Sequence, residues 1–226
     1  MKLPEDLTRT MPQALFLPLR DARLAADLLR PAGATGLVVF VHGSGSSRHS
    51  PRNQQVARYF NERQLATLLF DLLTEEENRL DMITREWRFN IPLLSRRLIE
   101  VIDWLTASVD LHELPLGLFG ASTGAAAALL AAAARPQDIH AVVSRGGRTD
   151  LAGSALAKVT APTLQIVGAE DDVVLALNRD TRQQLHCEQD LVVVPGATHL
   201  FEEPGTLEEV ARLAGDWFSH HLHRSG

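Results

Sequence analysis

Short runs of apolar residues alternate with helix-length segments along most of this chain, and this alternation restricts the fold more than any other feature of the sequence. The clearest run, Leu37–Val41, is apolar at every position, as expected of a strand buried on both faces of a sheet. Further strands are expected at residues 65–70, 116–119, 139–143, 163–167 and 190–194, with helices at 51–64, 91–107, 123–134, 174–186 and from 206 onward. Strands that alternate with helices form a mostly parallel sheet with helices on both faces. The sequence therefore predicts an α/β fold.

The first thirty residues follow a different pattern. Ala14–Pro18 and Arg23–Leu28 are two short apolar segments close together in the chain, which predicts an antiparallel hairpin at the edge of the sheet. Leu24–Leu29 is equally compatible with a helix. Between the expected strands that end at Val143 and begin at Thr163 lie about 19 residues, too few for an independent cap domain. We therefore expect residues 1–226 to form one domain without a cap.

Composition and charge exclude several classes of protein. The 226 residues include 22 Lys and Arg against 28 Asp and Glu, which gives a formal net charge of −6. Without a basic block, this balance argues against a nucleic-acid-binding protein. The longest apolar run, Ala125–Ala134, is about half as long as a membrane span, and the N-terminal residues lack the apolar core of a secretory signal. The single cysteine, Cys187, excludes an internal disulfide and a cysteine-clustered zinc site. We expect a cytoplasmic protein without nucleic-acid or membrane partners, and the sequence leaves a homodimer open.

One serine lies at a position typical of catalytic nucleophiles. The segment Gly120-Ala121-Ser122-Thr123-Gly124 follows an expected strand and precedes an expected helix. In this G-x-S-x-G pattern the glycines permit a strained turn that exposes the serine oxygen. The alternative is a structural role, in which Ser122 caps the helix.

A serine nucleophile requires a base that is itself oriented by a third group. Asp171 and His199 each follow an expected strand, and ligands of such sheets bind at the carboxyl ends of the strands. The order Ser122, Asp171, His199 is the chain order of α/β-hydrolases. Glu170 and Asp172 are alternatives for the acid, because acidic residues are also common at the start of a helix. We expect Asp171 to orient His199.

A hydrolase also needs backbone N–H groups that stabilise the oxyanion of its tetrahedral intermediate. Thr123, which follows the candidate nucleophile at a helix N-terminus, is expected to supply one of them. The second is expected from the loop after Leu37–Val41, with Ser44 as the first choice and Gly45 as the alternative.

Together these motifs resemble the α/β-hydrolase superfamily, and most closely its dienelactone-hydrolase-like branch. The resemblance covers residues 12–222 and rests on His42-Gly43-Ser44-Gly45, Gly120–Gly124, Gly168-x-x-Asp171-x-x-Val174 and Gly196-Ala197-Thr198-His199. It implies the α/β-hydrolase fold. The chain departs from the branch at one position, because dienelactone hydrolases carry a cysteine nucleophile where this chain has Ser122. Cys187 lies between the acid and histidine motifs and cannot replace it.

The sequence therefore predicts a serine hydrolase, without metal or other cofactor, that cleaves a small carboxylic ester or lactone through an acyl-enzyme. A peptidase or acyltransferase on the same triad is an alternative, as is a non-catalytic binding protein on the same fold. Arg145 and Arg148 follow the strand expected to end at Val143, and either arginine is a candidate to bind a substrate carboxylate. The alternative is that they pair with Asp150 or Asp171, or are solvated.

Other features receive structural interpretations. The segment Gly43–Arg48 follows a strand but lacks the third glycine of a dinucleotide-binding turn. His220-His221-x-His223 is interpreted as a set of exposed histidines at a helix end. Residues 75–77, all glutamate, are expected to cap or solvate the loop that enters the next segment. Met82, Trp87 and Phe89 are interpreted as packing residues.

Overall fold

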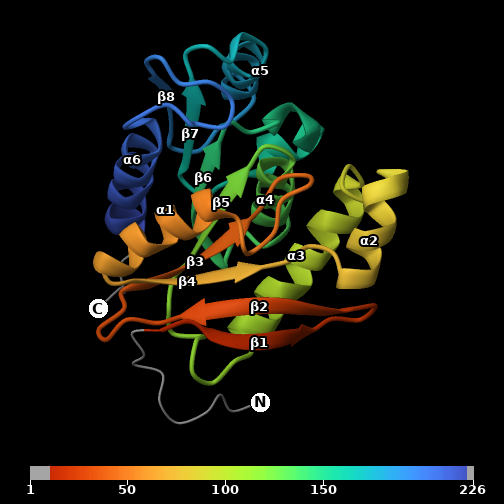
Figure 1. Ribbon diagram of the computed structural model, residues 1–226. Coiled ribbons are helices and arrows are strands. Elements are labelled where there is room, and N and C mark those ends of the chain that lie inside the picture. Colours follow the sequence, from red (N-terminus) through yellow and green to blue (C-terminus); the bar gives the residue numbers. More distant parts are fainter. Residues whose placement is uncertain (1–10, 223–226) are drawn as a thin grey trace.

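The computed structural model describes residues 11–222, which form one eight-stranded sheet in the order β1-β2-β4-β3-β5-β6-β7-β8 (Figure 1). The strands are β1 (Gln13–Pro18), β2 (Arg23–Leu29), β3 (Gly36–Val41), β4 (Leu65–Phe70), β5 (Leu116–Ala121), β6 (Ile139–Arg145), β7 (Thr163–Gly168) and β8 (Gln189–Val194). The helices are α1 (Pro51–Glu62), α2 (Glu75–Thr84), α3 (Ile91–Thr106), α4 (Thr123–Ala134), α5 (Asp172–Arg182), α6 (Thr206–His221) and the 3₁₀ helix η1 (Thr149–Lys158).

The expected antiparallel edge and parallel body of the sheet are both confirmed. Strand β1 pairs antiparallel with β2, and β2 pairs antiparallel with β4. From β4 through β3 to β8 every pairing is parallel. The helical alternative for Leu24–Leu29 is therefore wrong.

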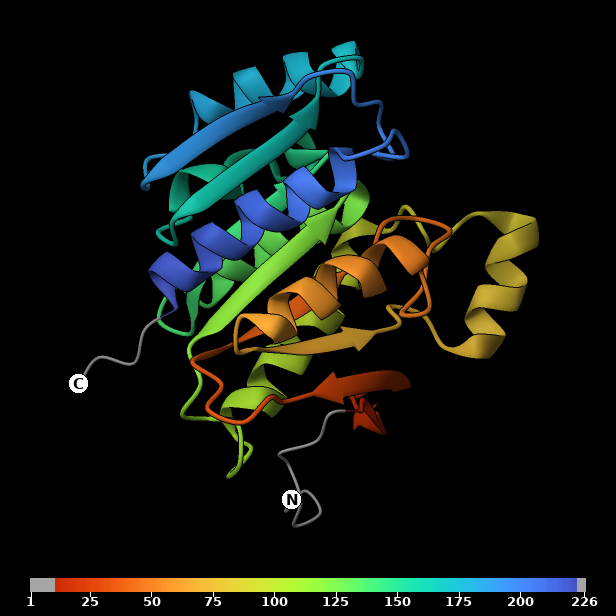
Figure 2. The same cartoon turned by 60° about the vertical axis from the view of Figure 1, so that its left-hand side comes forward.

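Helices cover both faces of the sheet (Figure 2). On one face, α1 and α6 pack over a cluster of four phenylalanine rings, with centroids 5.0 to 5.8 Å apart in the contacting pairs: Phe40, Phe60, Phe119 and Phe218. On the other face, α3 and α4 bury the larger apolar cluster. Helix α4 is mostly alanine, and these small side chains allow it to lie close against the strands. Within residues 11–222, no helix has the length and apolar character needed to span a bilayer.

Two helical segments, α2 and η1, were not predicted from the sequence. Residues 75–77, expected to cap or solvate a loop, are the first residues of α2, because Thr74 and Glu77 form a capping box at its N-terminus. Helix α2 projects from the body of the molecule (Figure 1) and buries only Asp81. Met82 of α2 and Phe89, which follows the helix, are exposed at 66% and 58%, so their interpretation as packing residues is wrong, whereas Trp87 is half-buried.

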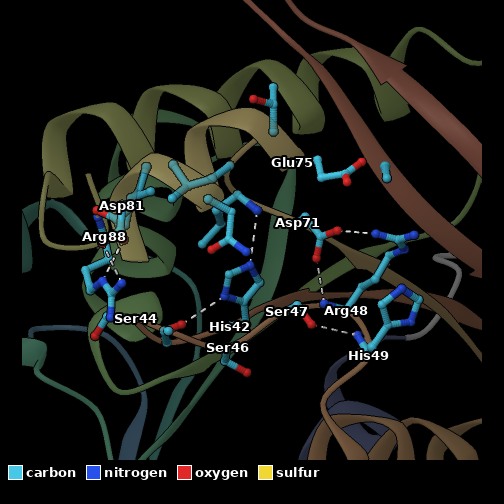
Figure 3. A pocket seen from close by; sticks show the side chains of 18 of the residues that line it. His42, Ser44, Ser46, Ser47, Arg48, His49, Asp71, Glu75, Asp81 and Arg88 are labelled. Atoms are coloured by element: carbon cyan, nitrogen blue, oxygen red, sulfur yellow. Dashed lines mark hydrogen bonds and ion pairs between the residues drawn. The ribbon is translucent and has the colours of Figure 1, made fainter. Parts of the chain in front are cut away.

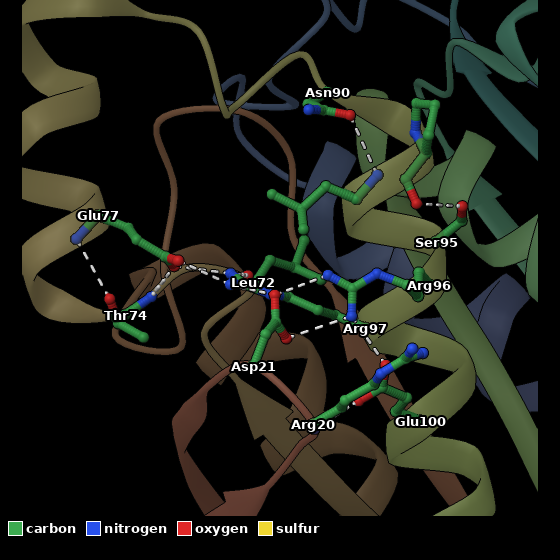
Figure 4. A network of polar contacts seen from close by, with 12 residues as sticks. Arg20, Asp21, Leu72, Thr74, Glu77, Asn90, Ser95, Arg96, Arg97 and Glu100 are labelled. Carbon is green, nitrogen blue, oxygen red and sulfur yellow. Dashed lines mark hydrogen bonds and ion pairs between the residues drawn. The ribbon is translucent and has the colours of Figure 1, made fainter.

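A buried arginine connects α2 to the rest of the protein (Figure 4). Arg97 of α3 is 1% exposed and donates to both carboxylate oxygens of Glu77 at 2.7 Å and to the Leu72 carbonyl at 2.9 Å. It also contacts Asp21 of the β1–β2 turn at 3.3 Å. Burial opposes ionisation of Glu77, but the hydrogen bonds from Arg97 and Thr74 outweigh it and leave the pKa of Glu77 below its ordinary value. One guanidinium thus holds the hairpin, the end of β4 and α2 together.

We expect Arg97→Ala to lower the free energy of unfolding by about 3–5 kcal/mol, because it leaves Glu77 and the Leu72 carbonyl without their partner. The adjacent Arg96 is the matched control. It pairs with Asp21 and Glu100 but is 38% exposed, so Arg96→Ala should cost about 0–1 kcal/mol. Urea unfolding followed by circular dichroism measures both values, and equal losses would contradict this role of Arg97.

Candidate active site

Ser122 lies at a strained turn between β5 and α4. Its φ is 50° and its ψ is −122°, a backbone conformation that is rare for residues other than glycine. The flanking glycines are required by close contacts, since a Cβ at Gly124 would lie 2.1 Å from the Val41 carbonyl oxygen. A Cβ at Gly120 would lie 2.5 Å from the Ala125 Cα. Ser122 occupies the position before α4, but its side chain makes no capping hydrogen bond, which argues against the structural alternative.

Asp171 and His199 are brought together by the loops after β7 and β8. The Asp171 Oδ2 lies 2.6 Å from the His199 Nδ1, and the Asp171 side chain is 13% exposed. These loops meet closely, because a Cβ at Gly168 would lie 2.2 Å from the Ala197 carbonyl oxygen. A carboxylate on Nδ1 fixes the imidazole tautomer and leaves Nε2 available as a base.

His199 and Ser122 each lie beside the end of β6. A Cβ at Gly146 would lie 3.5 Å from two atoms of the His199 ring, and Gly146 follows Arg145, whose carbonyl accepts a hydrogen bond from the Ser122 N–H at 3.2 Å. Among the described residues, the Ser122 hydroxyl makes no hydrogen bond to His199. Such contacts are often long in ligand-free enzymes and tighten when substrate binds.

The loop after β3 contacts the serine turn, as expected of an oxyanion loop. A Cβ at Gly43 would lie 3.0 Å from the Ser122 Cβ. The Ser44 N–H, however, donates to the Thr123 Oγ1 at 3.0 Å. The Ser44 N–H, an expected oxyanion donor, is thus occupied by the Thr123 hydroxyl. From the sequence, only the backbone N–H of Thr123 was assigned a role. Oxyanion stabilisation by Ser44 and Thr123 stays a prediction.

His42 belongs to the motif of this loop, but no role was predicted for it from the sequence. It is 8% exposed, its Nδ1 lies 2.9 Å from the Gly43 carbonyl oxygen, and its Nε2 accepts a hydrogen bond from the Leu72 N–H at 3.1 Å. These partners require a neutral ring with its proton on Nδ1. Burial lowers the pKa of His42 despite the Gly43 carbonyl and the nearby Asp71, both of which favour the proton. His42 thereby links the candidate oxyanion loop to the end of β4.

A second link is ionic. Arg48, further along the same loop, forms an ion pair with Asp71 after β4 and contacts Asp27 of β2 at 3.3 Å. Its backbone N–H also donates to the Asp71 Oδ1 at 2.8 Å. The loop is therefore fixed at both His42 and Arg48, and the glycine- and serine-rich segment between them is held at two points.

Both candidate substrate-binding arginines contact other side chains of the protein. Arg148 donates two hydrogen bonds of 2.9 Å to Asp150, one of the alternatives considered for it. Strand β6 extends to Arg145 instead of ending at Val143, so this residue lies within the sheet. Its guanidinium is buried near the Phe119 ring, with 5.7 Å from Cζ to the centroid, and the Nη1 atom has no partner among the described residues. Burial, together with Arg52, lowers the pKa of Arg145 to about 10.

The histidines at the C-terminal end do not form a described metal site. His220 and His221 lie at the end of α6, and His223 lies outside the described residues. Within residues 11–222, no group of three or more histidine, cysteine or acidic side chains is arranged to hold a metal ion.

The buried, neutral state of His42 predicts a specific dependence of stability on pH. Because the unfolded chain binds this proton more readily than the folded protein, stability should fall as the pH decreases below the ordinary histidine pKa of 6.5. We expect the wild type to lose up to about 1.4 kcal/mol per pH unit more than His42→Gln between pH 6.5 and 5. Urea unfolding at several pH values measures this difference.

His49→Gln is the control for this measurement, because His49 lies on the same loop but is exposed. It should retain the wild-type dependence on pH. Identical slopes in the wild type and His42→Gln would show that His42 is not held neutral by the fold.

Comparison with known proteins supports the reading of the motifs. A dienelactone hydrolase from Anabaena variabilis superimposes with a TM-score of 0.92 at 53% sequence identity, and the match covers 94% of this chain and 100% of that one. Est1E from Butyrivibrio proteoclasticus (17% identity, 92% and 98% covered, TM-score 0.78) shares the fold. So does an alpha-beta serine hydrolase homologue from Coxiella burnetii (20% identity, 90% and 96% covered, TM-score 0.73).

Two proteins of Mycobacterium tuberculosis, each named "Putative phosphoribosyl transferase", are 55% identical to the chain over 214 residues. The match covers 91% of this chain but 47% of each of theirs, so the chain spans about half the length of these curated relatives. No protein-family model matches the chain. Because the Anabaena protein is matched over its whole length at 53% identity, the chain belongs to the dienelactone hydrolase family, a branch of the α/β-hydrolases.

Proposed function

We propose that the chain is a serine hydrolase that cleaves a small carboxylic ester or lactone. The observation that carries this proposal is the 2.6 Å contact between Asp171 and His199, at the same edge of the sheet as the strained turn of Ser122. This combination supplies a nucleophile, a base and a group that orients the base. Family membership supports hydrolysis, whereas the serine and the ester are parts of the proposal.

In the proposed mechanism, the Ser122 Oγ attacks the carbonyl carbon while the His199 Nε2 takes the hydroxyl proton. Asp171 holds the imidazole by its Nδ1–H and stabilises the imidazolium. The oxyanion is stabilised by the Thr123 N–H, at the N-terminus of α4, and by the Ser44 N–H once the Thr123 hydroxyl releases it. His199 then protonates the leaving alkoxide. Water, activated by His199, hydrolyses the acyl-enzyme and regenerates Ser122.

Ser122→Ala should lower ester turnover by a factor on the order of 10⁶, with an unchanged circular dichroism spectrum, because the nucleophile is lost while the turn is kept. A fluorophosphonate probe should label the wild type and not the variant. Cys187→Ala is the control and should retain activity, because burial raises the pKa of the Cys187 thiol and keeps it protonated. An Ser122→Ala enzyme with a tenth of the wild-type rate would exclude Ser122 as the nucleophile.

Asp171→Asn should lower kcat by roughly 10⁴-fold, because the amide no longer favours the required tautomer of His199. Asp172→Asn is the matched control. Asp172 is the first residue of α5, where its charge interacts with the helix dipole for about 0.3–1 kcal/mol of stability, so its variant should keep nearly full activity. Steady-state kinetics on one chromogenic ester separates the two, and equal losses would mean that the acid is misassigned.

Arg145 and Arg148 remain the proposed residues for binding a carboxylate on the substrate. Arg145 is the stronger candidate of the two, because Arg148 already holds Asp150 and Arg145 has a buried N–H without a partner among the described residues. Removing the arginine that binds the anion should cost about 1.5–3 kcal/mol of preference for an ester with a distal carboxylate over its neutral methyl analogue. The kcat/KM ratio of the two esters measures this preference in Arg145→Ala and Arg148→Ala. A ratio that stays flat in both variants would exclude both residues.

A further inference from the structure

A cavity of about 540 Å³ lies beside the candidate oxyanion loop (Figure 3). Its walls are this loop, the residues that follow β4, helix α2 and the β1–β2 hairpin. The volume is within the range of small-molecule binding sites. Ser122 does not line the cavity, but Gly43 and Ser44 do, and Gly43 is also the residue in contact with Ser122. The cavity and the candidate nucleophile therefore meet the same short stretch of backbone.

The charges that line the cavity balance one another. Arg48 is paired with Asp71, and Arg88 donates to the Asp81 carboxylate at 2.6 Å. Arg23, which lies over the Phe16 ring at 4.9 Å, and Glu75 are one further charge of each sign on the lining. An anionic ligand would have to compete with carboxylates for the two paired arginines, and a cationic ligand would have to compete with those arginines for the carboxylates. The lining therefore favours an uncharged ligand.

The same lining favours a ligand with hydroxyl groups. The side chains of Ser44, Ser46 and Asn78 line the cavity and make no hydrogen bond within the described part of the chain. Each of them both donates and accepts hydrogen bonds, as a ligand hydroxyl does. A wholly apolar ligand would displace water from these groups and from the ion pairs. It would offer no hydrogen bonds in place of those that the groups make to water. The apolar side chains of the lining would contact the carbon skeleton of such a ligand: Phe16, Ala25, Leu72, Leu73 and Leu94.

The order of the strands indicates which part of a substrate could reach the cavity. Ser122 follows β5, His199 and Asp171 follow β8 and β7, and the cavity lies at the ends of β3 and β4, on the opposite side of β5 in the sheet. The leaving alcohol must lie near His199, because that residue protonates it. The acyl group, attached to the other side of the same carbonyl carbon, then extends toward β3 and β4.

We propose that this cavity binds the acyl part of the substrate, and that it selects an uncharged acyl group that carries several hydroxyls. The acyl role rests on the proposed ester hydrolysis, whereas the affinity for an uncharged polyol does not. In this proposal Asn78 of α2 and Ser46 of the loop after β3, which both line the cavity, bind the hydroxyls.

Binding is tested by titration calorimetry with D-gluconamide, an uncharged polyol that contains no ester bond for the enzyme to cleave. We expect saturable binding to the wild type and equally to Ser122→Ala, and a Kd about tenfold higher in Asn78→Leu, from the loss of hydrogen bonds to the amide. Glu76→Leu is the matched control, because Glu76 is exposed on the same helix and does not line the cavity. The absence of binding, or equal Kd values in Asn78→Leu and Glu76→Leu, would overturn the polyol site.

Selectivity is tested with phenyl 2,3-dihydroxypropanoate and its carbon isostere, phenyl 2-methylbutanoate. The ratio of their kcat/KM values, normalised to their rates in hydroxide, should favour the diol in the wild type. The ratio should fall about tenfold in Asn78→Leu and stay constant in Glu76→Leu. If both esters are hydrolysed with a ratio that no variant changes, the acyl site is wrong while ester hydrolysis stands. If gluconamide binds but neither ester is hydrolysed, the proposed hydrolysis and the acyl role fall together, and the polyol site remains.

Discussion

The contact between the N-terminus of α4 and the end of β3 determines where the rest of the candidate site can lie. At Gly124 the backbone of α4 passes so close to the Val41 carbonyl that there is no room for a side chain. This contact brings the loop after β3 against the serine turn, where Gly43 touches Ser122 and the Ser44 N–H reaches the Thr123 hydroxyl. A larger residue at Gly124 would separate the candidate nucleophile from its expected oxyanion donors, even though none of these candidate groups had changed.

The backbone of Leu72 connects this site to the periphery of the protein. Its N–H donates to His42, which holds the loop after β3, and its carbonyl accepts from Arg97, which holds α2 and the hairpin. Two buried side chains of different chemistry thus use the two polar groups of one residue. The walls of the cavity, which include this loop and α2, are positioned relative to each other through that residue. The polar character of α2 is consistent with this attachment. The helix is held by ion pairs and a capping box, and not by the burial of an apolar face.

Much of the fold could be predicted from the sequence because its strands are continuous apolar runs, and such runs are buried wherever they occur. Helix α2 was missed because it has no apolar periodicity, although the spacing of Thr74 and Glu77 is a capping box that could have indicated it. The 3₁₀ helix η1 was missed because Gly153 interrupts it with a non-helical conformation. Strand β6, which ends at Arg145, was predicted to end two residues earlier, at Val143, because a charged side chain does not indicate a buried strand.

The site could be predicted where a tight turn or a close approach of the backbone requires glycine, because such glycines are visible in the sequence. The pattern around Ser122 and Gly168 before Asp171 mark close approaches of the backbone, and Gly196 before His199 adopts a positive φ of 70°. The structure brings Asp171 and His199 into contact. Contacts that need no special backbone leave no such trace. The bond between Ser44 and Thr123 and the position of His42 depend on side-chain directions, which spacing along the chain does not encode.

The positive φ of Ser122 has a consequence for the chemistry that this turn can accept. The strain belongs to the main chain and is held by Gly120 and Gly124, so it is independent of the atom at the end of the side chain. A cysteine at this position would occupy the same turn at the same conformational cost. The fold thus specifies the place of the candidate nucleophile but not whether its reacting atom is oxygen or sulfur. Exchange between oxygen and sulfur is then a substitution of a single atom, and its effects are confined to the reactivity of that atom and to the groups that contact it.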